Sequence, residues 1–274
     1  MTRIWLVADD YGISPAVNAA IRDLLARGRI SATSAMVVAP AFSAEEAEAV
    51  GSIMRDGRHP PIGLHLTLTA PFKPLTENYT PLADGKFQSM GRTALAAFIG
   101  QIDPAVVAHE ARAQIVAFMS AFGRPPDFID GHQHVHLLPR VAEGVLTAVR
   151  SAAPNAWVRQ CGRAGEARSF DPKAMLLDLF SARFRQRAAA QGVRTNPVFA
   201  GAYAFGPHAR FAELFPRFLA GMREGGVIMC HPGVVDDMLR ALDPLTTLRE
   251  KEYEYFKGDA YTALLRERGV TLLP

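Results

Sequence analysis

The sequence IWLVADDYGISPAVNAAIRDLL at residues 4–25 contains the unit from which the fold is predicted. Ile4–Ala8 is a short apolar run that ends at the charged pair Asp9–Asp10, as expected of a buried strand. Ser14–Pro15 then indicates a helix start, because a serine oxygen can accept from exposed amides and a proline at the first helical position loses no hydrogen bond. The apolar residues that follow recur at helical spacing: Val17, Ile21, Leu24 and Leu25. The stretch predicts a strand followed directly by a capped helix.

The same alternation of short apolar runs and helical patterns continues along the chain. The further candidate strands are Ala32–Ala39, Ile62–Thr69, Asp127–His134, Ala156–Gln160, Phe199–Tyr203, Gly226–Cys230 and Thr271–Leu273. The further candidate helix starts are Asp103–Pro104, Asp171–Pro172 and Asp243–Pro244. Strands that alternate with helices predict a parallel sheet, either doubly wound or closed as a barrel. Because no GxGxxG motif follows the first strand, we favour an α/β fold of the TIM-like barrel type, with seven or eight irregular strands.

The chain shows no internal repeat, low-complexity run or linker, so residues 1–274 are read as one domain. The segment at about residues 162–197 is long for a simple connection. Its apolar residues include Met175, Leu176, Leu179, Phe180 and Phe184. This segment forms either a lid-like insertion over one mouth of the barrel or an ordinary packed helix, and the second alternative is favoured by default.

Composition restricts the class of protein and its compartment. A hydrophobic content of 49% with 21% charged residues describes a soluble globular protein. The formal net charge of +3 is too mild to indicate nucleic-acid binding, although peripheral contact with an anionic membrane stays open. Cys161 and Cys230 fit no zinc-finger or redox spacing, and so few thiols indicate a cytoplasmic protein. Neither a signal peptide nor a transmembrane segment is visible.

Polar residues fall where the predicted strands end. They are Asp9 and Asp10 after the first strand, His132, His134 and His136 at the fourth, Arg159 at the fifth and His231 after the seventh. In a parallel α/β barrel, the loops at the carboxyl ends of the strands form the active site. The sequence therefore predicts that these residues share one site.

Two of the strands bring metal-ligand types to a common face by period-two alternation. Within Ile62–Thr69 the leucines share one face, and His65 lies on the other. On the fourth strand, Asp130, His132 and His134 share a face by the same rule. Buried imidazoles and carboxylates need compensation, which a divalent cation supplies. Two imidazoles, one carboxylate and an open position for water suit zinc.

Each of these residues also has a plain structural explanation. Asp9–Asp10 would serve as a turn or helix cap, and His65 as a hydrogen-bonded core histidine. His231 would cap the turn that follows it, and Arg159 would form a structural ion pair. Taken one at a time these explanations are strong, but the whole set is better explained by a metal site.

Four stretches also resemble a known family. They read VADDYG at 7–12, GLHLTLT at 63–69, DGHQHVHLLP at 130–139 and CHPG at 230–233, and their order is similar to that in the YdjC/ChbG-like carbohydrate deacetylases, which include the hopanoid-associated HpnK branch. The resemblance runs from the first strand to near the C-terminus. One departure is Gln133, where some relatives have a further histidine, which leaves the ligands intact but affects their surroundings.

The resemblance implies a TIM-like barrel with an Asp–His–His metal site and a homodimeric assembly. Asp10, His65 and His132 then bind one divalent ion, with Zn²⁺ preferred and Mg²⁺ as the alternative. Asp9 lies where polysaccharide deacetylases of the wider class have their base, and His231 matches the late histidine expected to act as acid. The residues left to orient the ligands or contact substrate are Asp130, His134, His136 and Arg159.

Together these inferences predict a metal-dependent hydrolase that removes the acetyl group from an N-acetylated sugar. The sugar would be an oligosaccharide or a glycolipid such as an N-acetylglucosaminyl lipid. One alternative is a metallophosphoesterase, which would need a second metal and a denser set of acidic ligands. The other is a non-catalytic sugar- or lipid-binding barrel, which would leave Asp9 and His231 without a task.

Overall fold

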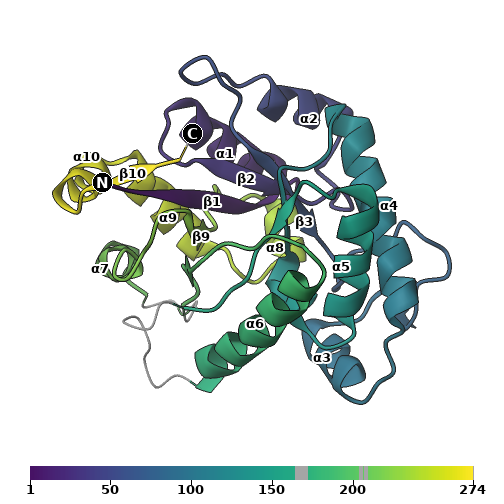
Figure 1. Cartoon of the computed structure of the whole chain (residues 1–274). Coiled ribbons are helices and arrows are strands. Elements are labelled where there is room, and N and C mark those ends of the chain that lie inside the picture. The colour runs from purple at the N-terminus through teal and green to yellow at the C-terminus, as the bar shows by residue number, and fades with distance from the viewer. Residues whose placement is uncertain (164–171, 204–205, 207–208, 274) are drawn as a thin grey trace.

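The computed structural model shows an α/β fold in which helices surround a curled parallel sheet (Figure 1). It describes residues 1–163, 172–203, 206 and 209–273. The strands are β1 (Thr2–Tyr11), β2 (Ala32–Ala35), β3 (Ile62–Leu66), β4 (Leu82–Ala83), β5 (Lys86–Phe87), β6 (Phe128–Gly131), β7 (Trp157–Val158), β8 (Phe199–Ala200), β9 (Gly226–Cys230) and β10 (Val270–Leu272). The helices are α1 (Pro15–Ala26), α2 (Ala44–Gly51), α3 (Met90–Phe98), α4 (Pro104–Phe122), the 3₁₀ helix η1 (His132–Leu137), α5 (Val141–Ala152), α6 (Pro172–Ala190), α7 (Phe211–Phe218), α8 (Asp237–Leu242), α9 (Thr247–Lys257) and α10 (Asp259–Glu267).

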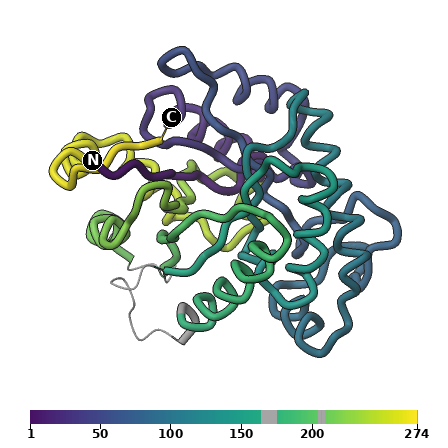
Figure 2. Tube along the Cα trace, viewed as in Figure 1, coloured from purple at the N-terminus to yellow at the C-terminus, as the bar shows by residue number. Residues whose placement is uncertain are grey.

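The main sheet has the strand order β7-β6-β3-β2-β1-β9-β8, and all neighbouring strands are parallel. β10 pairs with the start of β1, so the beginning and end of the chain run side by side (Figure 2). The two edges of the sheet are connected by isolated parallel bridges, Val158–Thr195 and Arg163–Phe199. The predicted α/β barrel with seven or eight irregular strands is confirmed. Its closure is irregular because β7 and β8 are only two residues long.

The central strand and the first helix form as their sequence predicts. Ile4, Leu6 and Val7 of β1 are fully buried. The Ser14 side chain accepts a hydrogen bond from the Val17 amide in the first turn of α1. The inward face of α1 carries the buried residues Val17, Ile21, Leu24 and Leu25. Burying these apolar side chains supplies the main stabilisation of a strand–helix layer.

The predicted strand ends differ from the structure on both sides of the site. β1 does not stop at Ala8 but continues through Asp9 and Asp10, so both carboxylates leave from the strand itself. β6 stops at Gly131, where the chain turns into η1. The prediction that His132 and His134 share a strand face with Asp130 is therefore wrong, because both histidines lie in η1, where a 3₁₀ turn replaces the period-two alternation.

The structure confirms one of the further predicted helix starts and contradicts another. Asp103 caps α4 as expected, with its side chain accepting from the Ala105 amide at 2.8 Å. Asp243 starts no helix, since α8 ends one residue before it and its side chain accepts from the Leu245 amide at 2.7 Å. Asp171 lies outside the described residues. The small antiparallel pair β4–β5 was not predicted, because two-residue strands leave no periodic pattern.

The described part of the segment at 162–197 packs against the barrel. In α6, Phe180 is buried and its ring centroid lies 5.5 Å from that of Phe98, while Phe184 contacts His136 edge-on at 5.6 Å. Arg163 pairs with Asp178 at 2.9 Å and so ties the start of the segment to the helix. These contacts suit a packed helix. Residues 164–171 lie outside the described chain, and the lid-like insertion remains a prediction.

Candidate functional site

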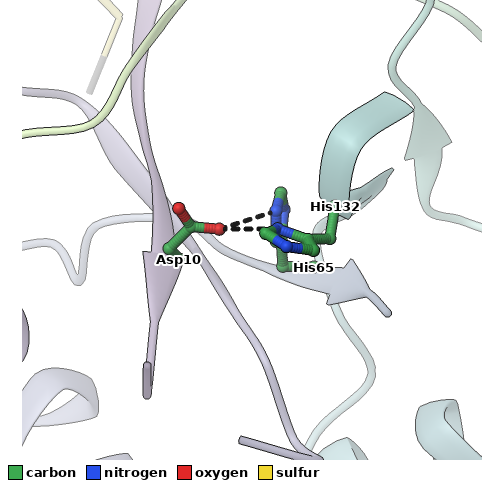
Figure 3. Close-up of side chains that lie close together, drawn as sticks. All are labelled: Asp10, His65 and His132. Atoms are coloured by element: carbon green, nitrogen blue, oxygen red, sulfur yellow. Dashed lines mark hydrogen bonds and ion pairs between the residues drawn. The ribbon is translucent and has the colours of Figure 1, made fainter. Parts of the chain in front are cut away.

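Three side chains from distant parts of the sequence converge at the carboxyl ends of the strands. Asp10 leaves the end of β1, His65 lies on β3, and His132 opens η1 directly after β6. Asp10 Oδ1 lies 3.1 Å from His65 Nε2 and 3.1 Å from His132 Nδ1 (Figure 3). The three candidate ligand atoms all lie within 4.8 Å of one another, and all three residues are buried. The residues predicted as metal ligands are therefore brought together in one place.

The backbone around these residues adopts the left-handed conformation at three non-glycine positions. Asp10 has a φ of 68°, Gln133 of 55° and His134 of 59°. Each non-glycine residue in this conformation costs about 1–3 kcal/mol of stability and persists only where the surrounding structure holds it there. Such residues are common at functional sites. Gly131 allows the tight turn, because a Cβ there would lie 2.5 Å from Nδ1 of His136. The local backbone therefore holds the histidine turn in one arrangement.

His65 is held with one ring nitrogen directed at Asp10. Its Nδ1 lies 2.6 Å from Asp130 Oδ1 and 3.1 Å from Ser34 Oγ, which leaves Nε2 facing Asp10. A carboxylate behind a ligating imidazole fixes its tautomer and orientation in metal sites. Burial lowers the pKa of His65, but Asp130 and Asp10 raise it overall to about 10. The space between His65 and Asp10 therefore favours a positive charge, as a cation site requires.

Asp10 is bonded to a different group through each of its oxygens. Its Oδ2 accepts a hydrogen bond from Arg249 Nη2 at 2.6 Å, on the side away from the two imidazoles. Burial raises the pKa of Asp10, but the Arg249 guanidinium and the imidazole hydrogen bonds bring it well below its ordinary value. Asp10 is therefore an ionised ligand candidate whose Oδ1 faces the two imidazoles.

A second acidic cluster lies behind the first and already contains a cation. Asp9, His65 and Asp130 also place ligand-type atoms within 4.8 Å of one another. Arg159 binds Asp9 with both guanidinium nitrogens, at 2.6 and 2.7 Å, and approaches Asp130 Oδ2 at 2.5 Å. Burial lowers the pKa of Arg159, but the two carboxylates raise it above its ordinary value. The guanidinium thus neutralises the cluster in place of a metal.

His231 follows β9, the strand that pairs with β1. Its backbone amide donates to Glu252 Oε2 at 2.6 Å, and the Tyr203 hydroxyl donates to Glu252 Oε1 at 2.6 Å. Burial lowers the pKa of His231, against the opposing influence of Asp10 and Asp9. Burial also raises the pKa of Glu252 to about 7. A buried carboxyl group therefore holds the turn that carries His231.

The other two histidines of the motif have different surroundings. His134 lines the pocket, with Nδ1 3.4 Å from Cys161 Sγ, and burial lowers its pKa to about 3. His136 is fully buried behind the turn, where Nε2 bonds the Arg159 carbonyl at 2.7 Å. His134 is thus placed to contact a ligand, whereas His136 supports the strand that carries Arg159.

The three candidate ligands border one pocket of about 380 Å³. Its polar lining comprises Asp9, Asp10, His65, His132, Gln133, His134, His231 and Asp243, and its apolar lining comprises Met229, Pro244 and Leu245. The volume falls at the small end of the usual range for small-molecule sites, about 300–1,000 Å³. A carboxylate and two imidazoles therefore meet at a pocket that is also lined by two further carboxylates, Asp9 and Asp243, and two further imidazoles, His134 and His231.

The family assignment comes from comparison with known proteins. The family described as YdjC-like protein matches residues 3–267 of this chain. The chain belongs to the YdjC-like family. This confirms the resemblance found in the four sequence motifs.

Relatives of this YdjC-like protein match it over most of its length. A protein of Clostridium beijerinckii named carbohydrate deacetylase is 25% identical and covers 99% of this chain and 98% of its own. A protein of Enterococcus faecalis with the same name is 30% identical, over 97% of this chain and 94% of its own. A solved Enterococcus faecalis structure, titled for cellobiose-phosphate cleavage, is 25% identical, with a TM-score of 0.75 over 99% of this chain and 97% of its own.

Several site residues of the YdjC-like protein have no sequence signal. Arg249 lies in the first turn of α9, and Asp243 was read as a helix start. Ser34 lies in the short buried strand β2, and Phe72, whose ring contacts His132 edge-on at 5.8 Å, lies in a loop. An isolated polar residue in a helix or strand looks the same whether or not it faces a site. Within the described residues, no helix is long and apolar enough to cross a membrane.

Proposed function

We propose that this YdjC-like protein is a metal-dependent hydrolase that removes the acetyl group from an N-acetylated sugar. The observation that carries the proposal is the position of Asp10 Oδ1, 3.1 Å from each of two imidazole nitrogens, at a pocket shared with Asp9 and His231. The names of the relatives, carbohydrate deacetylase and chitooligosaccharide deacetylase, support the substrate class.

The three proposed ligands fit one divalent ion. Two ring nitrogens and one carboxylate oxygen form the ligand set of many catalytic zinc sites, whereas Mg²⁺ prefers oxygen ligands alone. We therefore propose Zn²⁺ held by Asp10, His65 and His132, with Mg²⁺ as the alternative. Such an ion, when bound, polarises the amide carbonyl and makes water a better nucleophile.

Asp9 is the proposed general base. Arg159 grips both of its oxygens, so the carboxylate is oriented beside the pocket that it lines. A carboxylate fixed in this way can take the proton from the attacking water, and such proton transfer contributes about 10²–10⁴-fold to a rate. Arg159 in turn keeps the buried charge of Asp9 compensated, since an unpaired buried charge is costly.

His231 is the proposed general acid. An amine anion is a very poor leaving group, so the nitrogen of the amide must receive a proton as the C–N bond breaks. His231 lines the same pocket as Asp9, so its imidazole is within the site to deliver a proton to the departing nitrogen. The products are acetate and the free amino sugar.

The metallophosphoesterase alternative receives no support from the site. It needs a second metal, and the second cluster of the described residues that resembles a metal site holds the Arg159 guanidinium. The non-catalytic alternative leaves the clamped Asp9 unexplained. The deacetylase therefore accounts for more of the site than either alternative.

The direct test is acetate release by the zinc-loaded protein from a panel of N-acetylglucosamine conjugates. The panel contains short oligosaccharides and a glycolipid, because the proposal includes both kinds of substrate, and a phosphate ester as control. We expect acetate from at least one sugar, none after chelation, and recovery on adding Zn²⁺. Phosphate release without acetate release would contradict the proposal. We also propose a cytoplasmic location. We further propose that the protein is a homodimer, which sedimentation of the purified protein would test.

A further inference from the structure

Arg249 is a fully buried arginine in contact with a proposed metal ligand. It lies on α9, and its side chain crosses to the end of β1, where Nη2 donates to Asp10 Oδ2 at 2.6 Å. The two residues are 239 positions apart in the sequence. The contact therefore links the last part of the barrel to the first.

This contact divides the two oxygens of Asp10 between two tasks. Oδ1 faces His65 and His132, each at 3.1 Å, and Oδ2 is engaged by the guanidinium. A carboxylate whose second oxygen accepts a charge-assisted hydrogen bond is held in one orientation. Asp10 is therefore arranged to offer one oxygen, not two, to an ion held with the imidazoles.

The same guanidinium group also holds a wall of the pocket. Nη2 donates to Asp243 Oδ2 at 2.8 Å, and Nε donates to the Leu245 carbonyl at 2.9 Å. Asp243, Pro244 and Leu245 all line the pocket. The Arg249 carbonyl accepts from the Gly233 amide at 3.1 Å, two residues after His231. Arg249 is thus the common partner of a proposed ligand, a pocket wall and the His231 turn.

Stability alone gives a weak reason for this arrangement. Replacing a buried ion pair by apolar residues is often neutral or stabilising. Nη1 of Arg249 is buried and has no hydrogen-bond partner among the described residues, which adds a penalty. A residue that is costly to bury and contacts three parts of a pocket is better explained by the site.

We propose that Arg249 is a positioning residue of the proposed metal site. It leaves only Oδ1 of Asp10 directed at the imidazoles, and it holds the pocket wall formed by residues 243–245 in place beside the proposed ligands. The inference rests on the metal site of the proposed function and adds a residue that neither the family motifs nor the sequence patterns contain.

The test uses the Co²⁺-loaded full chain, because the visible absorption of cobalt reports its coordination number without any turnover. In Arg249→Met, Asp10 Oδ2 is released and can also bind the ion. We expect weaker visible bands, typical of higher coordination, and a loss of about 10–100-fold in kcat, as for other groups that orient metal ligands. Arg249→Lys keeps the charge but cannot make all three contacts, so we expect partial recovery of both quantities.

Two further variants separate the parts of the proposal. Asp243→Asn weakens the wall contact and leaves the Asp10 contact, so we expect a raised KM with the wild-type cobalt spectrum. Arg240→Met is the control for Arg249→Met, because it makes the same substitution at an exposed arginine of α8. It should change neither the cobalt spectrum nor kcat. A wild-type KM in Asp243→Asn would overturn the role of the wall.

The wild-type spectrum together with the wild-type kcat in Arg249→Met, even at a lower melting temperature, would overturn the proposal. If Arg249→Met does not fold, a wild-type spectrum together with a wild-type kcat in Arg249→Lys would overturn the proposal. A wild-type protein that binds cobalt but releases no acetate would contradict the proposed function. The spectral comparison would still decide the role of Arg249.

Discussion

Two clusters of the same residue types lie side by side in this site, and they differ in how their negative charge is balanced. Both contain His65: one joins it to Asp10 and His132, the other to Asp9 and Asp130. In the second cluster the Arg159 guanidinium lies between the two carboxylates. In the first, Arg249 takes only the outer oxygen of Asp10 and leaves the inner one facing two imidazoles.

The difference shows that ligand-type residues alone do not define a metal site. A carboxylate cluster that contains a guanidinium has its counter-charge built in, and its remaining task is to hold side chains in place. In the cluster whose inner face carries two ring nitrogens and one carboxylate oxygen, the guanidinium contacts only the outer oxygen of Asp10. We therefore propose the ion for the first cluster and the base, Asp9, for the second.

The largest effect is expected from removing a proposed ligand. Asp10→Ala and His132→Ala should lose the bound ion and all measurable acetate release, because two remaining ligands hold zinc poorly. Metal content by elemental analysis and acetate release check this. Full metal occupancy in His132→Ala would remove His132 from the ligand set.

The next effect sharpens the contrast between the clusters. Asp9→Asn keeps the shape of the side chain but removes the proposed base, so kcat should fall by about 10²–10⁴-fold. Metal content should stay at one ion per chain, since Arg159 binds both oxygens of Asp9 and Asp9 is not among the proposed ligands. Parallel loss of the ion would mean that the two clusters act as one.

Glu252 differs from the carboxylates of both clusters, because its hydrogen bonds come from the Tyr203 hydroxyl and the His231 amide and not from a guanidinium. Burial raises its pKa from 4.5 to about 7. The folded state therefore holds a proton that the unfolded chain has released, and the associated stability is lost as pH rises from about 4.5 through 7. Compared with Glu252→Gln, the wild type should lose about 3 kcal/mol more free energy of unfolding between pH 4 and 8. Urea unfolding at both pH values measures this, and equal losses would contradict it.

The smallest effect is expected at the carboxylate behind His65. Asp130→Asn weakens the partner of Nδ1 without removing a ligand, so zinc affinity should fall by about 10–100-fold. Competition with a chromogenic chelator measures the affinity. Ser34→Ala is the matched control, because its hydroxyl contacts the same ring nitrogen at the longer distance of 3.1 Å, and its loss should be smaller.

Much of the fold, and the convergence of the three candidate ligands, could be predicted from the sequence. The apolar runs placed seven of the barrel strands and β10, and Ser14 and Asp103 marked their helices correctly. The motifs led to Asp10, His65 and His132 because charged or imidazole groups at the ends of buried strands are conspicuous against apolar surroundings. Less was predictable about their environment: the His134 turn was read as strand, and Asp243 as a helix start.

By itself, the sequence determined the alternation of strands and helices, the family, and which residues are candidates for chemistry, because these depend on local periodicity and on short motifs. Only the tertiary structure decided which carboxylate is paired with Arg159, which with Arg249, and which imidazole nitrogens face Asp10. Such pairings join residues far apart in the sequence, by as much as 239 positions for Arg249 and Asp10, and depend on side-chain directions. Those directions are set by the curl of the sheet and by left-handed turns, which leave no periodic trace in the chain.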